Sequence, residues 1–529
     1  MPNTWDYLVL TASNALQAEA YERQLTARKQ LGMLPQVRNA FVVPDIGGRR
    51  IGSGGSTLWC LVEILKRERS GVGIEQTLRP LRILIVHAGG DSRRLPAYGP
   101  CGKIFVPLPG DDAGPLPPTL FDRLVPAFLS LPPGPSGQGQ VVVTSGDALI
   151  FLDAAQVEFQ PGLTALACYA TPEEASRHGV FCMRANGAVS LYLQKPSLAT
   201  QTATGAIGPQ GLTPLDIGVM NFDAAGVAAL LNAFEVQSGP EGRLDFATRS
   251  RTRILEHGVD LYREICCAPG TQSTLEHYLR GTAGSGSSWP KDALAEIYSA
   301  LRKIPFHVQM VPSCRFLHFG STRQLIESGV ALAPDSSVLD VNNIFLSDGL
   351  VTGQDSWIEG CRVRAALVLG GLNVLAGVEV DTPLSLPREA CLEVIRGYSH
   401  SGDPVWFVRC YGIRDTFKHS IEAGGLFCGR PLAEWLAAAD AGEDEIWPDV
   451  ATETERTLWN ARVFPAVPES GDYRRWLWMY APETASAEER NAFRQASRYS
   501  AAEIALLTDQ DAFHSRRIEI WKSSARNGI

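Results

Sequence analysis

A predicted strand that runs into a glycine turn and then into basic residues is the strongest chemical signal in the sequence. The apolar run 81–87 leads into the turn 88–90, and Arg93, Arg94 and Lys103 follow. A Gly-Gly turn lets the backbone approach a phosphate chain closely, with amide hydrogens directed at its oxygens. Either arginine can bind phosphate through two hydrogen bonds, and the lysine adds a point charge. The pattern predicts a triphosphate site, with a solvated basic turn as the alternative.

A second glycine-rich segment opens a helix that is predicted over residues 57–69. A helix N-terminus attracts anions, so the segment is a second candidate for nucleotide binding, with a flexible turn as the alternative. It is not a Walker A motif, because no Gly-Lys-Ser/Thr follows it. It resembles the glycine loop of small-molecule kinases, which keeps a sugar kinase open as an alternative function. Its residues are Gly52, Ser53, Gly54, Gly55, Ser56 and Thr57.

Polar residues also stand at the ends of other predicted strands. Asp147 follows a buried strand, where its carboxylate can hold Mg²⁺ against phosphate oxygens or cap a helix. Lys195 ends an alternating strand, where it can meet a sugar phosphate or simply be solvated. His178-Gly179 and Asp216 are weaker candidates that could contact a sugar or cap a turn.

The first third of the chain alternates apolar runs with helical patterns. Strands of nearly continuous Val, Ile and Leu between helices predict a parallel sheet covered on both faces, in a Rossmann-like α/β domain. Ligands in such folds bind beyond the carboxyl ends of the strands, where the glycine turns and Asp147 fall. The predicted strands are 7–11, 40–44, 81–87, 140–144, 163–169 and 189–193, and the predicted helices are 12–32 and 57–69.

After this domain the hydrophobic period changes to six. Val351, Trp357, Val363, Leu369 and Leu375 share the spacing, with glycines between them. A six-residue repeat places one short strand on each face of a triangular coil, with the repeated side chain stacked inside, so it predicts a β-helix. An ordinary meander is the alternative. We expect a catalytic domain over 1–305, a β-helix domain over 306–415 and a mostly helical region over 416–529.

Composition excludes several classes of protein. The chain has 529 residues, of which 45% are hydrophobic and 20% charged, as in ordinary globular proteins. The net charge of −9 argues against a nucleic-acid partner. No apolar stretch is long enough for a membrane span, the N-terminus lacks the basic region of a signal peptide, and the 11 cysteines lack framework spacing. We expect a cytoplasmic enzyme.

These segments, in this order, resemble the sugar-1-phosphate nucleotidyltransferases. The closer match is to the fucose-1-phosphate guanylyltransferase branch, including the pyrophosphorylase half of bifunctional fucokinase/GDP-fucose pyrophosphorylases. The resemblance covers nearly the whole chain. Its segments are 52–57, 87–96, 145–147, 178–181, 193–197, 216–218, 260–262, 319–322 and 411–418.

The resemblance implies a left-handed parallel β-helix after the nucleotidyltransferase domain, and roles for individual residues. In the broader group, a second metal carboxylate precedes a Gly-Ser/Thr pair, and here His318 stands at that place. Either His318 binds the metal or the ligand comes from elsewhere, such as Asp260 or Glu264. The implied site comprises the catalytic residues Arg94, Lys103 and Lys195, nucleotide-binding Gly89, Gly90, Arg93 and segment 52–57, sugar-binding His178, Gly179 and Asp216, and Asp147 with His318 for Mg²⁺.

The resemblance also implies the reaction. GTP and L-fucose 1-phosphate would give GDP-L-fucose and pyrophosphate by in-line attack on the α-phosphate, assisted by Mg²⁺. Another sugar 1-phosphate or base is an alternative, as is an inactive regulatory subunit that binds nucleotide sugars. No kinase-like half follows within the 529 residues, so we expect no phosphorylation of free fucose. A β-helix offers a flat stacking face, which is compatible with a homo-oligomer.

Overall fold

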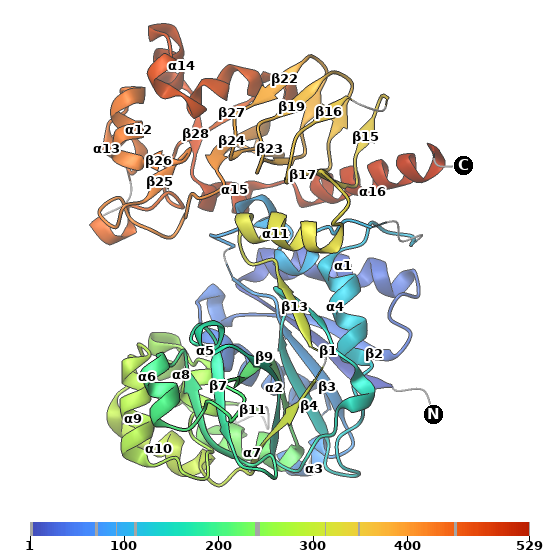
Figure 1. The fold of residues 1–529 in the computed structure, drawn as a ribbon, viewed down its shortest axis with the longest axis vertical. Coiled ribbons are helices and arrows are strands. Elements are labelled where there is room, and N and C mark those ends of the chain that lie inside the picture. The colour runs from blue at the N-terminus through green and yellow to red at the C-terminus, as the bar shows by residue number, and fades with distance from the viewer. Residues whose placement is uncertain are drawn as a thin grey trace. The chain divides into compact units, whose positions relative to one another are not determined.

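The chain divides into two compact units, each built from separate segments (Figure 1). The computed structural model describes residues 4–68, 72–90, 92–110, 114–238, 244–312, 314–347, 350–448 and 452–527. Unit 1 comprises residues 1–90, 124–146 and 150–316, and unit 2 comprises 91–123, 147–149 and 317–529. Asp91, in the predicted triphosphate segment, lies outside the described residues.

Unit 1 is built around a mixed β-sheet. Its strands are β1 (Trp5–Ala12), β2 (Val37–Pro44), β3 (Arg82–His87), β4 (Gln140–Ser145), β6 (Leu163–Ala170), β7 (Gly179–Met183), β8 (Val189–Gln194), β9 (Thr213–Phe222) and β12 (Phe306–Met310). The order is β12-β6-β9-β4-β3-β1-β2, with β7 between β9 and β8. β1 to β4 run parallel, as predicted. β9 is antiparallel to β4 and β6, so the sheet is not parallel throughout.

Helices connect the strands of unit 1. The side chain of Asn14 accepts the Gln17 amide at the start of α1, and Arg28 and Lys29 lie in its last turn, where a helix favours positive charge. The elements are α1 (Ala15–Gln30), η1 (Ile46–Gly48), α2 (Gly52–Glu68), α3 (Ile74–Leu78), η4 (Ala154–Gln156), α5 (Pro172–Ala175), α6 (Leu198–Ala203), α7 (Ala224–Ala233), α8 (Thr248–His257), the π-helical turn η5 (Leu261–Cys266), α9 (Leu275–Gly284) and α10 (Lys291–Leu301), with the hairpin β10 (Val236–Ser238) and β11 (Leu244–Phe246).

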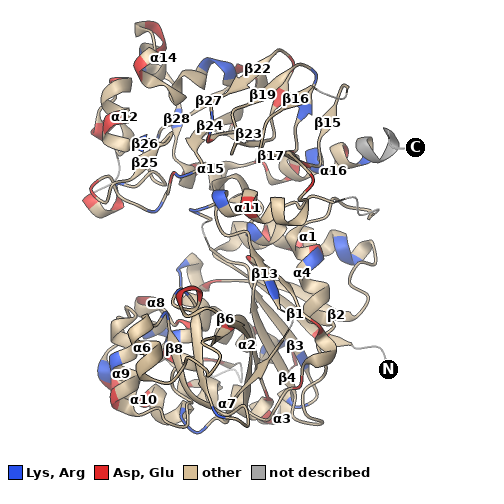
Figure 2. Ribbon diagram, in the orientation of Figure 1, with Lys and Arg blue, Asp and Glu red and all other residues tan. Residues whose placement is uncertain are grey.

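The core of unit 1 lies on both faces of its central strands. Neighbouring residues along a strand point to opposite faces of the sheet, and here both neighbours are buried. The fully buried residues include Leu8, Val9, Leu84, Ile85 and Val142. Figure 2 accordingly shows these strands mostly in tan, with charged residues mainly on helices and loops. The continuous apolar runs therefore reflect burial of the sheet from both sides, as expected.

Unit 2 contains three ladders of short parallel strands that the chain visits in turn. The first ladder is β14 (Val338–Val341), β17 (Ser356–Glu359), β20 (Val374–Ala376) and β23 (Ala390–Tyr398). The second is β15 (Ile344–Phe345), β18 (Arg362–Val363) and β21 (Glu379–Val380), and the third is β16 (Val351–Thr352), β19 (Leu367–Leu369) and β22 (Leu384–Leu386). The six-residue period thus corresponds to short parallel strands, whereas the left-handed sense of the coil stays a prediction.

The repeated side chains stack inside this coil. Trp357, Val363, Leu369 and Leu375 are buried, whereas Val351 is only half-buried. The residues that pair across the first ladder are Leu339, Trp357, Val374 and Cys391. The ladders cover residues 338–398, and β12 pairs with β6 in unit 1, so the predicted boundary at 305 falls ahead of the last strand of the first unit.

The rest of unit 2 is a mixture of helices, turns and short strands. β24 (Pro404–Gly412) pairs antiparallel with β23 and leads to β27 (Phe464–Val467), which pairs with β28 (Arg498–Tyr499). The other elements are η2 (Pro96–Tyr98), η3 (Lys103–Phe105), α11 (Thr322–Leu332), β25 (Leu426–Phe427), β26 (Arg430–Pro431), α12 (Leu432–Ala439), α13 (Glu443–Ile446), η6 (Glu453–Glu455), η7 (Ser470–Tyr480), η8 (Pro482–Thr484), α14 (Ala487–Gln495), α15 (Ala501–Leu507) and α16 (Gln510–Asn527). The chain passes between the units within α4 (Leu120–Leu129), β5 (Ala148–Phe151) and β13 (Arg315–His318).

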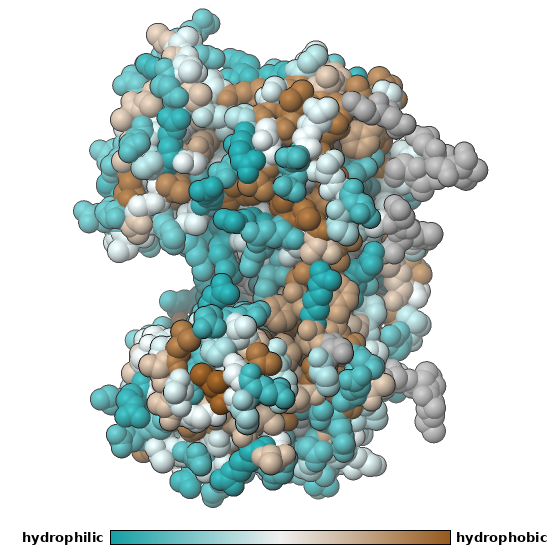
Figure 3. All heavy atoms as spheres, in the orientation of Figure 1, coloured by the Kyte–Doolittle hydropathy of each residue, from teal (hydrophilic) through white to brown (hydrophobic). Residues whose placement is uncertain are grey.

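Hydrophobic side chains reach the surface in separate groups among polar ones, on the face that Figure 3 shows. Leu346 and Val368 of the coil are 70% and 48% exposed. Scattered exposure of this kind is normal, so a homo-oligomer stays a prediction. In the described parts of the chain, no helix combines the length and apolarity needed to cross a membrane.

Candidate active site

A group of charged side chains in unit 2 is the best candidate for an active site. Lys103 begins η3, and its Nζ donates to the carbonyl oxygen of Gly320 at 3.0 Å. The same Nζ lies 4.0 Å from Oδ2 of Asp147. The amide of Phe319 donates to the carbonyl oxygen of Asp147 at 2.9 Å, which holds these two segments side by side.

Gly320 lies between the Asp147 carboxylate and the Arg94 guanidinium. A Cβ atom at position 320 would be 3.4 Å from Oδ2 of Asp147 and 3.7 Å from Nη2 of Arg94. The amide of Thr322, at the start of α11, donates to the Arg94 carbonyl at 2.8 Å. The structure therefore brings together Arg94, Lys103 and Asp147. Gly320 was not predicted as a site residue, although it lies in segment 319–322 of the resemblance.

The electrostatics of this group favour an anionic ligand. Burial lowers the pKa of Lys103 below its usual value; the Asp147 carboxylate opposes this shift, and the positive charges of Arg94 and Lys418 add to it. Cations held near one another raise each other's free energy, and a bound anion relieves this repulsion. Guanidinium and ammonium groups in such an arrangement suit phosphate oxygens.

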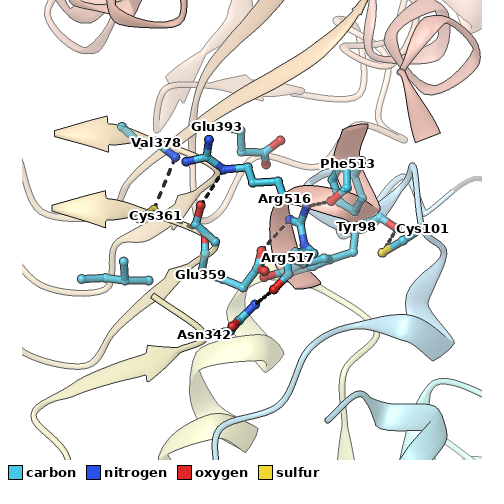
Figure 4. A network of polar contacts seen from close by, with 12 residues as sticks. Tyr98, Cys101, Asn342, Glu359, Cys361, Val378, Glu393, Phe513, Arg516 and Arg517 are labelled. Atoms are coloured by element: carbon cyan, nitrogen blue, oxygen red, sulfur yellow. Dashed lines mark hydrogen bonds and ion pairs between the residues drawn. The ribbon is translucent and has the colours of Figure 1, made fainter. Parts of the chain in front are cut away.

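A buried polar network fixes the segment between Arg94 and Lys103 (Figure 4). The hydroxyl of Tyr98, in η2, accepts a hydrogen bond from Nε1 of Trp357 at 2.8 Å and donates to Oε2 of Glu359 at 3.4 Å. Glu359 in turn forms an ion pair of 2.6 Å with Arg517 of α16, and both side chains are almost completely buried. The C-terminal helix thus stabilises the segment that presents Arg94 and Lys103.

A second buried ion pair holds the same segment. Nη2 of Arg409 donates to the carbonyl of Pro96 at 2.9 Å and pairs with Glu393, whose other partner is the hydroxyl of Tyr411. Arg409 and Glu393 are 1% and 0% exposed. The sequence contains no signal for these contacts, because they join residues 313 positions apart in one case and 261 in another.

The glycine turn at the end of β3, in unit 1, uses its amides internally. The amides of Ala88 and Gly89 donate to Oγ1 of Thr11 at 3.1 and 3.2 Å, and that of Gly90 donates to Oγ of Ser13. The expectation that these amide hydrogens face phosphate is therefore corrected: hydroxyl groups at the end of β1 accept them. Nucleotide binding by Gly89 and Gly90 stays a prediction.

The glycine-rich segment of unit 1 is helical rather than a loop. Gly52, Ser53, Gly54, Gly55, Ser56 and Thr57 form the first turns of α2. The Val259 carbonyl accepts the amides of Gly54 and Gly55 at 2.8 and 3.1 Å, and Ser53 accepts the amide of Leu261. The chain itself therefore satisfies much of this helix N-terminus. The glycines are explained by close packing, and their part in nucleotide binding stays a prediction.

Gly52→Ala is expected to destabilise unit 1 more than Gly32→Ala. Both glycines have a positive φ, +77° and +69°, which costs a residue with a side chain roughly 1–2 kcal/mol. A Cβ atom at Gly52 would overlap the Val259 carbonyl, whereas nothing lies within 4 Å at Gly32, so overpacking should add about 1–3 kcal/mol at Gly52 alone. Urea denaturation of both variants measures the difference. Equal losses of unfolding free energy would contradict the close contact between α2 and Val259.

Two of the predicted sugar-binding residues lie in one buried cluster of unit 1. The Tyr192 hydroxyl donates to Oδ2 of Asp216 at 2.7 Å, and the Gly218 amide donates to Oδ1 at 2.7 Å. Burial raises the pKa of Asp216 to about 6. A Cβ atom at Gly179 would overlap the Tyr192 hydroxyl, so a glycine is required there. These contacts give both residues a packing role, and sugar binding stays a prediction.

The structure brings Lys195 and His178 together beside this cluster. Lys195 follows β8, is exposed, and donates its amide to the His178 carbonyl at 2.9 Å. The His178 ring lies 5.9 Å from the ring of Phe316. The predicted binding of a sugar phosphate by the Lys195 ammonium stays a prediction.

The expected metal ligands differ in how well they suit Mg²⁺. Over the residues that the structure describes, no group of three or more His, Cys, Asp or Glu side chains is placed to hold a metal ion. Asp260 accepts the amides at the start of η5, and the buried Glu264 pairs with Arg263, so both carboxylates have structural roles. Mg²⁺ prefers oxygen ligands and commonly takes one or two carboxylates plus phosphate oxygens. Asp147 fits this preference, whereas the imidazole of His318 fits it less well.

Comparison with known proteins identifies a family. The model for the fucose pyrophosphorylase domain matches residues 75–469, which is more than half of the chain. The chain belongs to the fucose pyrophosphorylase family. This membership confirms the resemblance noted in the sequence. The residues matched to the fucose pyrophosphorylase domain include Arg94, Lys103, Asp147 and Gly320, whereas segment 52–57 precedes them.

Named relatives of this fucose pyrophosphorylase family member agree with the assignment. Over 95% of its length it is 27% identical to the bifunctional fucokinase/GDP-fucose pyrophosphorylase of Arabidopsis thaliana, and over 92% it is 25% identical to the L-fucokinase/L-fucose-1-P guanylyltransferase of Bacteroides fragilis. The chain spans about half the length of these two relatives, 50% and 49%. It is also 24% identical to the fucose-1-phosphate guanylyltransferase of Mus musculus, over 96% of the chain and 90% of that protein.

Proposed function

We propose that this chain makes GDP-L-fucose and pyrophosphate from GTP and L-fucose 1-phosphate. The proposal rests on Lys103, which is held between the Gly320 carbonyl and Asp147, beside Arg94, within the residues that match the fucose pyrophosphorylase domain. The choice of sugar and base is supported by the relatives, whose names specify fucose 1-phosphate and a guanylyl group.

The proposed reaction depends on charge neutralisation rather than proton transfer. A sugar phosphate has a second pKa of about 6, so its oxygen is already anionic at pH 7 and needs no general base. This oxygen forms a bond to the α-phosphorus of GTP while the bond from that phosphorus to pyrophosphate breaks. Arg94 and Lys103 would stabilise the charge that develops on the phosphate oxygens, and Lys195 would bind the sugar phosphate.

Mg²⁺ is part of the proposal as an ion held by oxygen. Asp147 would bind it, with phosphate oxygens as further ligands, and His318 is retained as a candidate second ligand. When bound, the ion would neutralise part of the triphosphate charge. Arg93, Gly89, Gly90 and segment 52–57 are proposed to contact the nucleotide, and His178, Gly179 and Asp216 the sugar.

Three finer statements belong to the same proposal. The parallel coil is proposed to be a left-handed β-helix, a fold supported by its six-residue repeat and its three ladders. We place the enzyme in the cytoplasm, because its 11 cysteines lack the spacing of a disulfide framework. Its partners would be GTP and the sugar 1-phosphate, without nucleic acid or membrane, and it could act as a homo-oligomer.

A substrate panel tests the proposed function. The four ribonucleoside triphosphates are each combined with fucose-, mannose-, glucose- and galactose-1-phosphate in the presence of Mg²⁺, and released pyrophosphate is measured. Release confined to GTP with fucose 1-phosphate is expected, with the product confirmed by mass. Pyrophosphate release with another pair would assign different substrates to the enzyme. No release with any pair would favour an inactive regulatory subunit.

A further inference from the structure

Segment 411–418, at the end of β24, forms a rigid turn that the proposed function does not use. The buried carboxylate of Asp415 accepts three amide hydrogens, from Gly412 at 2.6 Å, from Cys428 at 2.7 Å and from Gly429 at 3.0 Å. A Cβ atom at Gly412 would lie only 2.7 Å from the Gly429 nitrogen. The backbone that leads to Lys418 is therefore held in one conformation.

Phe417 fixes the position of the next residue, Lys418. The Phe417 ring is fully buried, 6.1 Å from the ring of Phe464 and 6.5 Å from that of Trp459. The amide of Trp459 also donates to the carbonyl of Phe417 at 3.2 Å. Lys418 itself is exposed. The buried Phe417 ring therefore fixes the backbone from which the Lys418 side chain extends.

Aromatic packing connects the segment of Lys418 with Arg93 of the candidate site. The guanidinium of Arg93 lies over the ring of Trp459, 5.7 Å from its centre, which is a cation–π contact. The ring of Trp459 also lies 6.5 Å from that of Phe417, the residue before Lys418. All of these residues belong to unit 2. The turn after β24 thus carries a cation next to the aromatic residues that contact Arg93.

We propose that Lys418 is a further substrate-binding residue, whose ammonium contacts the triphosphate of the nucleotide. The physical reason is charge: in a protein of net charge −9, Lys418 adds a cation to those of Arg93, Arg94 and Lys103, which together favour a polyanion. This inference rests on the proposed function for the identity of the ligand. It assigns the turn that follows β24 a direct role in binding.

Binding of tripolyphosphate and of GTP to purified full-length variants tests this role without requiring turnover. Lys418→Ala should weaken both by about 10- to 100-fold, since a hydrogen bond to a charged group contributes about 1.5–3 kcal/mol. Lys418→Arg should restore most of the affinity. Because Lys418 is exposed, the melting temperature should not change.

Arg414→Ala is the matched control. Arg414 is an exposed cation in the same turn, 61% exposed, and it pairs with Glu389 at 2.7 Å. Its loss should leave both affinities unchanged. Wild-type affinity in Lys418→Ala, an equal loss in Arg414→Ala, or no polyphosphate binding by the wild type would each overturn the proposal. If the wild type binds GTP in a Lys418-dependent way but forms no nucleotide sugar, the proposed function fails and the assignment of Lys418 stands.

Discussion

Replacing Lys103 by alanine is expected to reduce turnover by about 10²- to 10³-fold while the fold stays intact. This is the typical cost of removing one preorganised group that stabilises transition-state charge. Lys103 Nζ has both a backbone oxygen of Gly320 and the Asp147 carboxylate in reach, so its position is set before substrate binds. Loss of the hydrogen bond from Lys103 Nζ to the Gly320 carbonyl should cost only about 0.5–1.5 kcal/mol of stability.

Lys66→Ala provides the comparison for Lys103→Ala. Lys66 is also partly buried, at 25% exposure against 18% for Lys103, and pairs with Glu63 on α2. It should lower stability slightly and leave turnover unchanged. Initial rates at saturating GTP and fucose 1-phosphate, with melting temperatures for each variant, separate the two effects. A Lys103→Ala enzyme with near-wild-type turnover would remove the basis of the proposed site.

Arg517→Met is expected to cost about 3–5 kcal/mol of unfolding free energy, because it leaves Glu359 buried without its charged partner. Glu359 is fully buried, and burial raises the pKa of its carboxyl group although Arg517 opposes the shift. The same change should lower activity, since Arg517 no longer positions Glu359, which accepts the hydrogen bond of Tyr98 between Arg94 and Lys103.

The double variant Glu359→Leu/Arg517→Met distinguishes the effect of an unpaired buried charge on stability from the effect of the lost Tyr98 acceptor on activity. Replacing both partners of a buried pair with apolar residues is often nearly neutral for stability. Much of the lost unfolding free energy should therefore return, while activity stays low because Tyr98 has lost its acceptor. Urea denaturation and kcat are measured for all three proteins. A single variant as stable as the wild type would show that the ion pair does not hold α16 to the coil.

The sequence predicts the elements of this fold better than the partners of its polar groups. The strands of unit 1 were recognisable because Leu84, Ile85 and Val142 are buried on both faces of a sheet, which requires continuous apolar runs. The coil was recognisable because a stacked side chain such as Trp357 recurs once per strand. β9 was not among the predicted strands, and its antiparallel direction was not recognisable either, because side-chain pattern does not encode strand direction.

In the candidate site, too, the sequence predicts residue types better than the partners of polar groups. Arg94, Lys103 and Asp147 could be predicted from their types and spacing, because phosphate chemistry demands cations and a metal carboxylate near glycine turns. The hydroxyls of Thr11 and Ser13, which take the amides of the 88–90 turn, lie 77 residues away in sequence. Only the three-dimensional arrangement shows that these amides are already used, and that segment 52–57 itself forms the first turns of α2 rather than a loop before the helix.

The fate of each phosphate of GTP tests the reaction class most directly. The protein is incubated with Mg²⁺, fucose 1-phosphate and GTP labelled at either the α- or the γ-phosphate, and the products are separated. Nucleotidyl transfer predicts that the α-label appears in the nucleotide sugar and the γ-label in pyrophosphate. Appearance of the γ-label on the sugar, with release of GDP, would contradict nucleotidyl transfer and identify a kinase instead.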